Sequence, residues 1–133
     1  MTDKENRELI QYRFGKASET MQEVKFLFEN QLWNNAVNRL YYRCFYAVGA
    51  LLASVNVYTK THSGASQMFS LHFIKQGIFE KEDHKIFTTL LDMRQDADYE
   101  DFIDYEESDV APLIDPAKQL ISHIEKYIAP FLN

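Results

Sequence analysis

Two arginine-bearing stretches contain the residues of this sequence that could do chemistry. The first, residues 38–48, reads NRLYYRCFYAV and carries Arg39, Tyr42 and Arg43. It lies in a run whose apolar residues recur at steps of three and four, which predicts a helix. A guanidinium in a core helix must be paired or bound to an anion, because an unpaired buried charge is costly. We therefore expect this helix to build the core and to carry a site.

The second stretch, residues 94–99, reads RQDADY. Arg94 and Asp98 are four residues apart and can pair on one helix face. If Arg39 approaches the same place, two guanidiniums meet a carboxylate and the phenol of Tyr42. The planar fork of arginine suits phosphate oxygens, which predicts a phosphate or nucleotide site formed by these four residues. The alternative is an interhelical ion pair that only fixes the register of the helices.

The histidines do not predict a metal site. None of His62, His72, His84 and His123 shows the spacing of a zinc-binding helix. The sequence also has no glycine-rich phosphate loop and no nucleophile elbow, which argues against the kinase and hydrolase classes. No metal and no cofactor are therefore expected. His62 differs from the others because it stands at an expected helix start, beside Lys60 and Thr61.

Composition limits the class of protein. A chain of 133 residues is long enough for one domain, which we place at residues 1–133. Its 46% hydrophobic and 26% charged residues are typical of a globular protein rather than a disordered one. We find no apolar run of the ~18 residues that span a bilayer and no apolar signal segment, so we expect a cytoplasmic protein without a membrane anchor.

Charge is distributed unevenly along the chain. The formal net charge is −6, but residues 80–109 alone carry −9 and the remainder carries +3. This pattern argues against a broad surface that coats nucleic acid, and it leaves room for a small anion site built from a few arginines. The acidic segment could also dock a basic partner.

Hydrophobic periodicity predicts an all-α protein. We expect helices over about residues 3–29, 33–55, 61–77 and 80–99, then an acidic loop at 100–109 and a last helix around 110–128 with a proline in its first turns. The first helix has a regular apolar seam and is interpreted as scaffold. The expected architecture is an antiparallel up-and-down bundle of four to five helices.

Three segments in this order resemble HEPN-domain proteins. They are AVNRLYY at residues 36–42, THSG at 61–64, and Arg94 followed by ADY at 97–99. The likeness runs from about Ile10 to Ile128 and is greatest to the short stand-alone bacterial branch found near small nucleotidyltransferases. The resemblance implies a HEPN-like bundle that forms a homodimer, often as half of a toxin–antitoxin pair. The expected partners are a nucleotidyltransferase-type antitoxin and RNA or a nucleotide.

The resemblance also implies candidate catalytic residues. In ribonuclease members of the family, a catalytic arginine is followed on the same helix by a histidine that acts as general acid–base, while the arginine stabilises the pentacovalent phosphate without a metal. Arg94 matches the arginine, but Tyr99 stands where the histidine would be. A tyrosine, with an ordinary pKa near 10, is a poor base at neutral pH. His62 substitutes for it only if the fold brings it close.

The sequence therefore leaves three hypotheses. The leading one is a HEPN-type module that binds nucleotide or RNA phosphate in a pocket of Arg39, His62, Arg94, Asp98 and Tyr99. The second is an active metal-independent endoribonuclease toxin that uses Arg94 with His62 or Tyr99. The third is a non-catalytic interaction partner whose polar cluster fixes helix register and whose acidic face docks a second protein.

Overall fold

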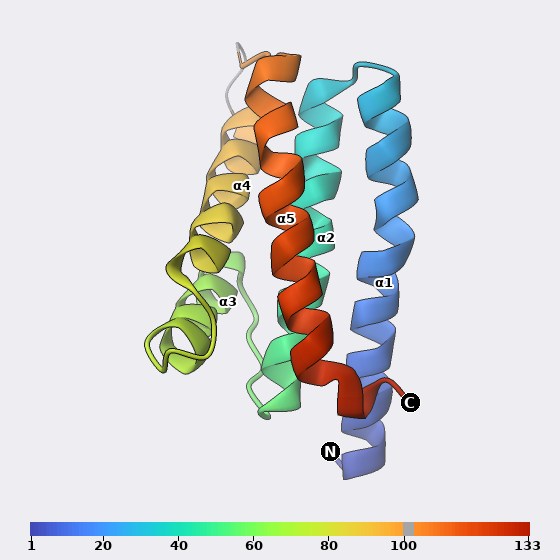
Figure 1. Cartoon of the computed structure of the whole chain (residues 1–133), viewed down its shortest axis with the longest axis vertical. Coiled ribbons are helices and arrows are strands. Elements are labelled where there is room, and N and C mark those ends of the chain that lie inside the picture. The colour runs from blue at the N-terminus through green and yellow to red at the C-terminus, as the bar shows by residue number, and fades with distance from the viewer. Residues whose placement is uncertain (100–102) are drawn as a thin grey trace.

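The structure, a computed structural model, describes residues 1–99 and 103–133 and confirms the all-α bundle. Its five α-helices are α1 (Asp3–Glu29), α2 (Trp33–Ser54), α3 (His62–Phe69), α4 (Lys81–Tyr99) and α5 (Glu107–Ile128), with a π-helical turn η1 (Ser70–Ile74) and a 3-10 turn η2 (Ala129–Phe131). Figure 1 shows α1, α2, α4 and α5 side by side along the long axis, with both termini at one end of the bundle. No helix in the described ranges is long and apolar enough to cross a membrane.

Helix α2 is the central element of the bundle. It packs against α1, α3, α4 and α5, and half of its residues are buried. The largest of these, Tyr41, is fully buried and stacks on Phe87 of α4 with ring centroids 5.6 Å apart. Burial of each large apolar side chain stabilises the fold by roughly 1.5–3 kcal/mol. Residues on the edges of this buried face are consequently held in fixed positions.

Helices α1 and α2 end with the same local structure. Gln31 and Asn56 follow the two helices with φ of 59° and 60°. The amide of the next residue then bonds back to a carbonyl five residues earlier, Leu32 to Leu27 and Val57 to Leu52, each at 2.9 Å. This pair of Schellman motifs satisfies the last helix carbonyls and reverses the chain. The α1–α2 turn therefore brings the end of α1 beside the start of α2.

Helix α3 starts at a capping side chain and ends in a π-helical turn. Thr61 caps it, accepting the Gly64 amide at 2.9 Å, which makes His62 its first residue. The prediction of one helix from about 61 to 77 is wrong beyond Phe69. The chain there widens into η1, where the Lys75 amide bonds to the Ser70 carbonyl at 2.9 Å, and it turns at Gly77 with φ of 74°.

Helices α4 and α5 are joined by hydrogen bonds between His123 and the buried carboxylate of Asp83. Asp83, 3% exposed, accepts from His123 Nδ1 with both carboxylate oxygens at 3.0 Å and also accepts the Glu80 amide at the start of α4. Helix α5 begins at Glu107, earlier than predicted, so Pro112 and Pro116 lie inside it rather than in its first turn. Of the predicted acidic loop at 100–109, residues 100–102 lie outside the described residues and only 103–106 are irregular.

Candidate functional site

Tyr42 on α2 lies between two guanidiniums from different helices. The Arg39 guanidinium carbon is 5.3 Å from the centroid of the Tyr42 ring, and that of Arg94 on α4 is 5.6 Å from it. Both distances are within the range of cation–π contact. The structure therefore brings together the two arginines and the phenol on which the sequence-based hypothesis depends, and the packing of α2 against α4 positions them.

Arg94 is buried beside two tyrosines. The residue is 7% exposed, and its guanidinium carbon also lies 5.1 Å from the Tyr41 ring. Its Nη1 donates to Asp98 Oδ2 at 3.3 Å, the predicted pair four residues along the helix. Its buried Nε has no hydrogen-bond acceptor among the described residues. A buried guanidinium with one weak carboxylate contact retains capacity to bind an anion.

His62 joins the same cluster from the first turn of α3. Its Nδ1 lies 2.7 Å from the Tyr41 hydroxyl, and its ring centroid is 4.5 Å from that of Phe45 and 5.9 Å from that of Tyr42. Burial, together with the charge of Arg94, lowers the pKa of His62 below its ordinary value. The imidazole is therefore neutral at pH 7.

Tyr41 determines how the proton on His62 is placed. Burial raises the pKa of Tyr41 far above its ordinary value, against an opposing effect of Arg94, so the phenol stays protonated. When the phenol donates to His62 Nδ1, the imidazole proton resides on Nε2. In the other neutral tautomer, Nδ1–H donates to the phenol oxygen and Nε2 is a free base. The pair can therefore present either an acid or a base.

The structure describes the side chain of Asp98 but not that of Tyr99, the two other predicted site residues at the end of α4. Asp98 is exposed apart from its contact with Arg94. Tyr99 is the last residue of α4, directly after Asp98, but its side chain lies outside the described part of the chain. Arg39, Tyr42, His62 and Arg94 form one cluster with Asp98 at its edge, and the position of the Tyr99 phenol stays a prediction.

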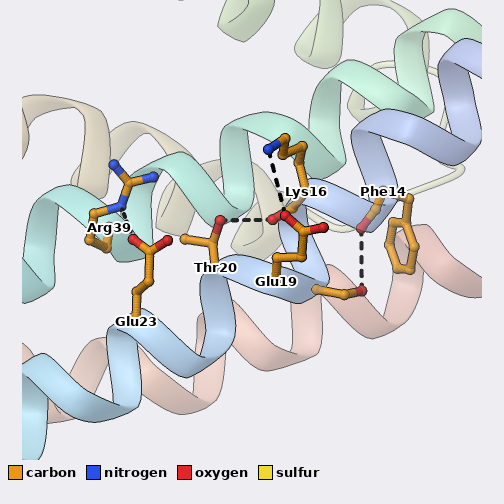
Figure 2. Close-up of polar contacts among 7 residues, drawn as sticks. Phe14, Lys16, Glu19, Thr20, Glu23 and Arg39 are labelled. Atoms are coloured by element: carbon orange, nitrogen blue, oxygen red, sulfur yellow. Dashed lines mark hydrogen bonds and ion pairs between the residues drawn. The ribbon is translucent and has the colours of Figure 1, made fainter.

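One further residue of this region was not predicted. Glu23 of α1, treated as scaffold in the sequence analysis, lies 3.1 Å from Arg39 Nε, as Figure 2 shows. This contact lacks the alignment of a hydrogen bond. Exposed ion pairs of this kind contribute little to stability. Glu23 therefore orients Arg39 but neutralises only part of its charge.

Arg43 lies one helical turn beyond Arg39 on α2. Burial lowers the pKa of Arg43, and its buried Nε and Nη1 find no acceptor among the described residues. Arg43 was already noted in the sequence as a guanidinium of this core helix.

His84 and His123 link helices. His84 Nε2 lies 3.1 Å from Ser66 Oγ, and His123 pairs with Asp83 as described above. Within the described residues, no three histidine, cysteine or carboxylate side chains stand close enough together to hold a metal ion.

The sequence of this helical bundle shows the class of protein to which the chain belongs. The HEPN domain model matches residues 10–127, and the chain belongs to this family.

Individual relatives cover almost the entire chain. A UPF0332 protein of Thermotoga maritima is 34% identical over 124 residues, which are 93% of this chain and 94% of the relative. A protein of Methanocaldococcus jannaschii, named a candidate toxin, is 34% identical over 132 residues, 99% of this chain and 98% of the relative. A second M. jannaschii protein with the same designation is 29% identical over 113 residues, 85% and 77% of the two chains.

The lowered pKa of His62 predicts an acid-sensitive site. The folded protein holds His62 neutral where the unfolded chain binds a proton, so its contribution to stability is complete above the ordinary histidine pKa of about 6.5 and is lost as pH falls below it. His62→Gln should therefore reduce the loss of unfolding free energy between about pH 7 and pH 5, measured by urea unfolding. His72→Gln on η1 should keep the wild-type slope, and an unchanged slope in His62→Gln would contradict the assignment.

Proposed function

We propose that this HEPN domain binds the phosphate of a nucleotide or RNA at the cluster of Arg39, Arg94, His62 and Tyr42. The observation that carries the proposal is the pair of guanidiniums from α2 and α4 on one tyrosine ring, beside a neutral imidazole. Arginine matches the geometry of phosphate oxygens with two parallel N–H donors. The positive charge of these guanidiniums is confined to a small region of a chain whose net charge is −6. A small anionic group fits such a region better than an extended polyanion does.

Guanidinium nitrogens without hydrogen-bond partners support the binding of an external anion more than they support an internal ion pair. Buried nitrogens of Arg39, Arg43 and Arg94 make no hydrogen bond to described residues. Buried donors are nearly always satisfied by protein, water or ligand, and a cluster of unsatisfied ones marks a place where something binds. Glu23 and Asp98, the two carboxylates in contact with these arginines, are both more than one-third exposed and compensate only part of the charge.

We further propose that the protein is a homodimer and the HEPN half of a toxin–antitoxin pair with a nucleotidyltransferase antitoxin. Support comes from the relatives that are named candidate toxins and from the family membership. The segment 80–109 carries a formal charge of −9 in the sequence, which favours a basic partner. Sedimentation of the purified protein tests the dimer, and co-purification with a nucleotidyltransferase encoded beside it tests the pair.

Replacement of Arg94 should remove binding without unfolding the protein. Arg94→Met keeps the volume and removes a buried charge, so stability should be retained or increased. Affinity for a fluorescein-labelled RNA octamer, measured by anisotropy, should fall about 10- to 100-fold, because charge-assisted hydrogen bonds contribute about 1.5–3 kcal/mol. Wild-type binding should also weaken as salt rises.

Arg7→Met is the matched control for that experiment. Arg7 bonds to the carbonyls of Pro130 and Asn133 near the C-terminus, so its loss removes the same charge away from the cluster. It should bind RNA like the wild type. Equal affinities of Arg94→Met and wild type, with both folded, would leave the cluster as a device for helix register and would contradict the proposal.

A second candidate function is metal-independent RNA cleavage, favoured by the contact between His62 and Tyr41. With Nδ1–H donated to the phenol oxygen, His62 Nε2 accepts the proton of a ribose 2′-hydroxyl. The 2′-oxygen then bonds to the adjacent phosphorus and the bond to the 5′-oxygen breaks, with a proton supplied to that oxygen by water. The products are a 2′,3′-cyclic phosphate and a 5′-hydroxyl, and Arg94 stabilises the extra negative charge on the phosphorus oxygens.

Cleavage in the presence of a metal chelator tests this candidate. Over-expression should arrest growth and degrade RNA, and Arg94→Ala should relieve the arrest. In vitro, His62→Gln should lower the cleavage rate by about 100-fold or more, as expected for loss of a general base, whereas Tyr99→Phe should leave it near wild type. Loss of cleavage in Tyr99→Phe but not in His62→Gln would assign the role to the tyrosine, and an inert wild type would exclude the reaction.

A further inference from the structure

A pocket of about 530 Å³ lies against Arg39 at the bundle end opposite the termini. The end of α1, the start of α2 and the end of α4 form its walls, and Figure 1 shows these three helix ends at that side of the bundle. Its volume falls within the ~300–1,000 Å³ of small-molecule sites. Asn34 fixes the wall between α2 and the segment before α5, because its amide bonds to Ile103 O and the Tyr105 amide, each at 2.8 Å.

The groups that line the pocket are not those of a second phosphate site. Among the described residues, two carboxylates, Glu23 and Asp98, line it together with one cation, Arg39. Asn35 and Asn38 add two side-chain amides that make no hydrogen bond to a described residue. The pocket carries more acceptors than the phosphate site, because carboxylates accept hydrogen bonds from amino groups and asparagine amides pair with base edges.

An exposed aromatic ring completes the pocket. Phe26 of α1 lines it and is 61% exposed, so its ring is accessible from the pocket. Exposed aromatic rings beside a positively charged site are the platforms on which unpaired bases stack. The pocket thus combines a stacking surface, free amides and carboxylates.

The pocket shares a wall with the phosphate site. Arg39 lines the pocket and also contacts the Tyr42 ring, and Asp98 lines the pocket and also accepts from Arg94 Nη1. A group bound in the pocket and a phosphate on the arginines would therefore be neighbours. Adjacent base and phosphate sites of this kind fit one nucleotide unit of a strand.

We propose that this pocket binds an unpaired nucleobase that carries an exocyclic amino group, in single-stranded RNA whose adjacent phosphate lies on Arg39 and Arg94. The inference rests on the proposed function of the phosphate site. Adenine, cytosine and guanine all carry such a group, whose protons are donated to the carboxylates of Glu23 or Asp98 while the ring stacks on Phe26. Uracil places carbonyl oxygens on either side of its one ring N–H, and these oxygens repel the carboxylates.

Binding of four labelled octamers tests the proposal with the full chain: oligo-rA, oligo-rC, oligo-rU and an abasic ribose-phosphate strand. By fluorescence anisotropy, oligo-rA and oligo-rC should bind the wild type about 10-fold more tightly than the other two. Asn35→Ala and Phe26→Ala change exposed residues that the fold tolerates. Each should reduce the affinity for oligo-rA and oligo-rC about 10-fold and leave the abasic strand unchanged. Tyr12→Ala, another exposed aromatic on α1, is the matched control and should behave as wild type.

The outcomes separate this proposal from the one on which it rests. Equal wild-type affinities for all four strands, lost together in Arg94→Met, would overturn the base pocket and leave the phosphate site standing. A uniform loss across all four strands in Asn35→Ala and Phe26→Ala would also overturn base recognition. Absence of binding by any strand would overturn both proposals.

Discussion

The buried guanidinium of Arg94 is the constraint on which the site depends. It stands against the faces of Tyr41 and Tyr42, with one weak carboxylate contact and a nitrogen that has no acceptor among the described residues. Burial of a charge this poorly compensated costs several kcal/mol in the free protein, so the arrangement persists because the surrounding packing enforces it. The proposed function follows from this constraint, because a bound phosphate would offset that cost.

Helix α2 connects the residues of the cluster to the core of the bundle. Its buried face fixes Tyr41 against Phe87, and the same tyrosine hydroxyl holds His62 from α3. Its partly exposed edge carries Arg39 and Tyr42, which connect the cluster to α1 and α4. A single helix thus links the core, the imidazole and both arginines, so changes in packing and changes in the site are coupled. Stability and binding should be measured together in every variant for this reason.

Much of the fold could be predicted because helical periodicity is a local property. The bounds of α1 and α2 follow from apolar spacing, and Thr2 also caps the start of α1. The approach of Arg39 to Arg94 follows from their positions on α2 and α4, which pack together. The π-helical turn at Ser70–Ile74 leaves no mark in apolar spacing, since Phe69 and Phe73 are four residues apart and suit an α-helix equally well. Glu23 and the pocket beyond Arg39 depend on how α1 lies across α2, which the sequence alone does not specify.

The pKa of His62, measured by NMR titration in the wild type and in Arg94→Met, tests the convergence of these groups most directly. The structure predicts a wild-type pKa below the ordinary value of about 6.5 and an upward shift when the Arg94 charge is removed, because that charge disfavours imidazolium. Arg7→Met should leave the value unchanged. A His62 pKa that is the same in wild type and Arg94→Met would show that the two side chains do not share a site.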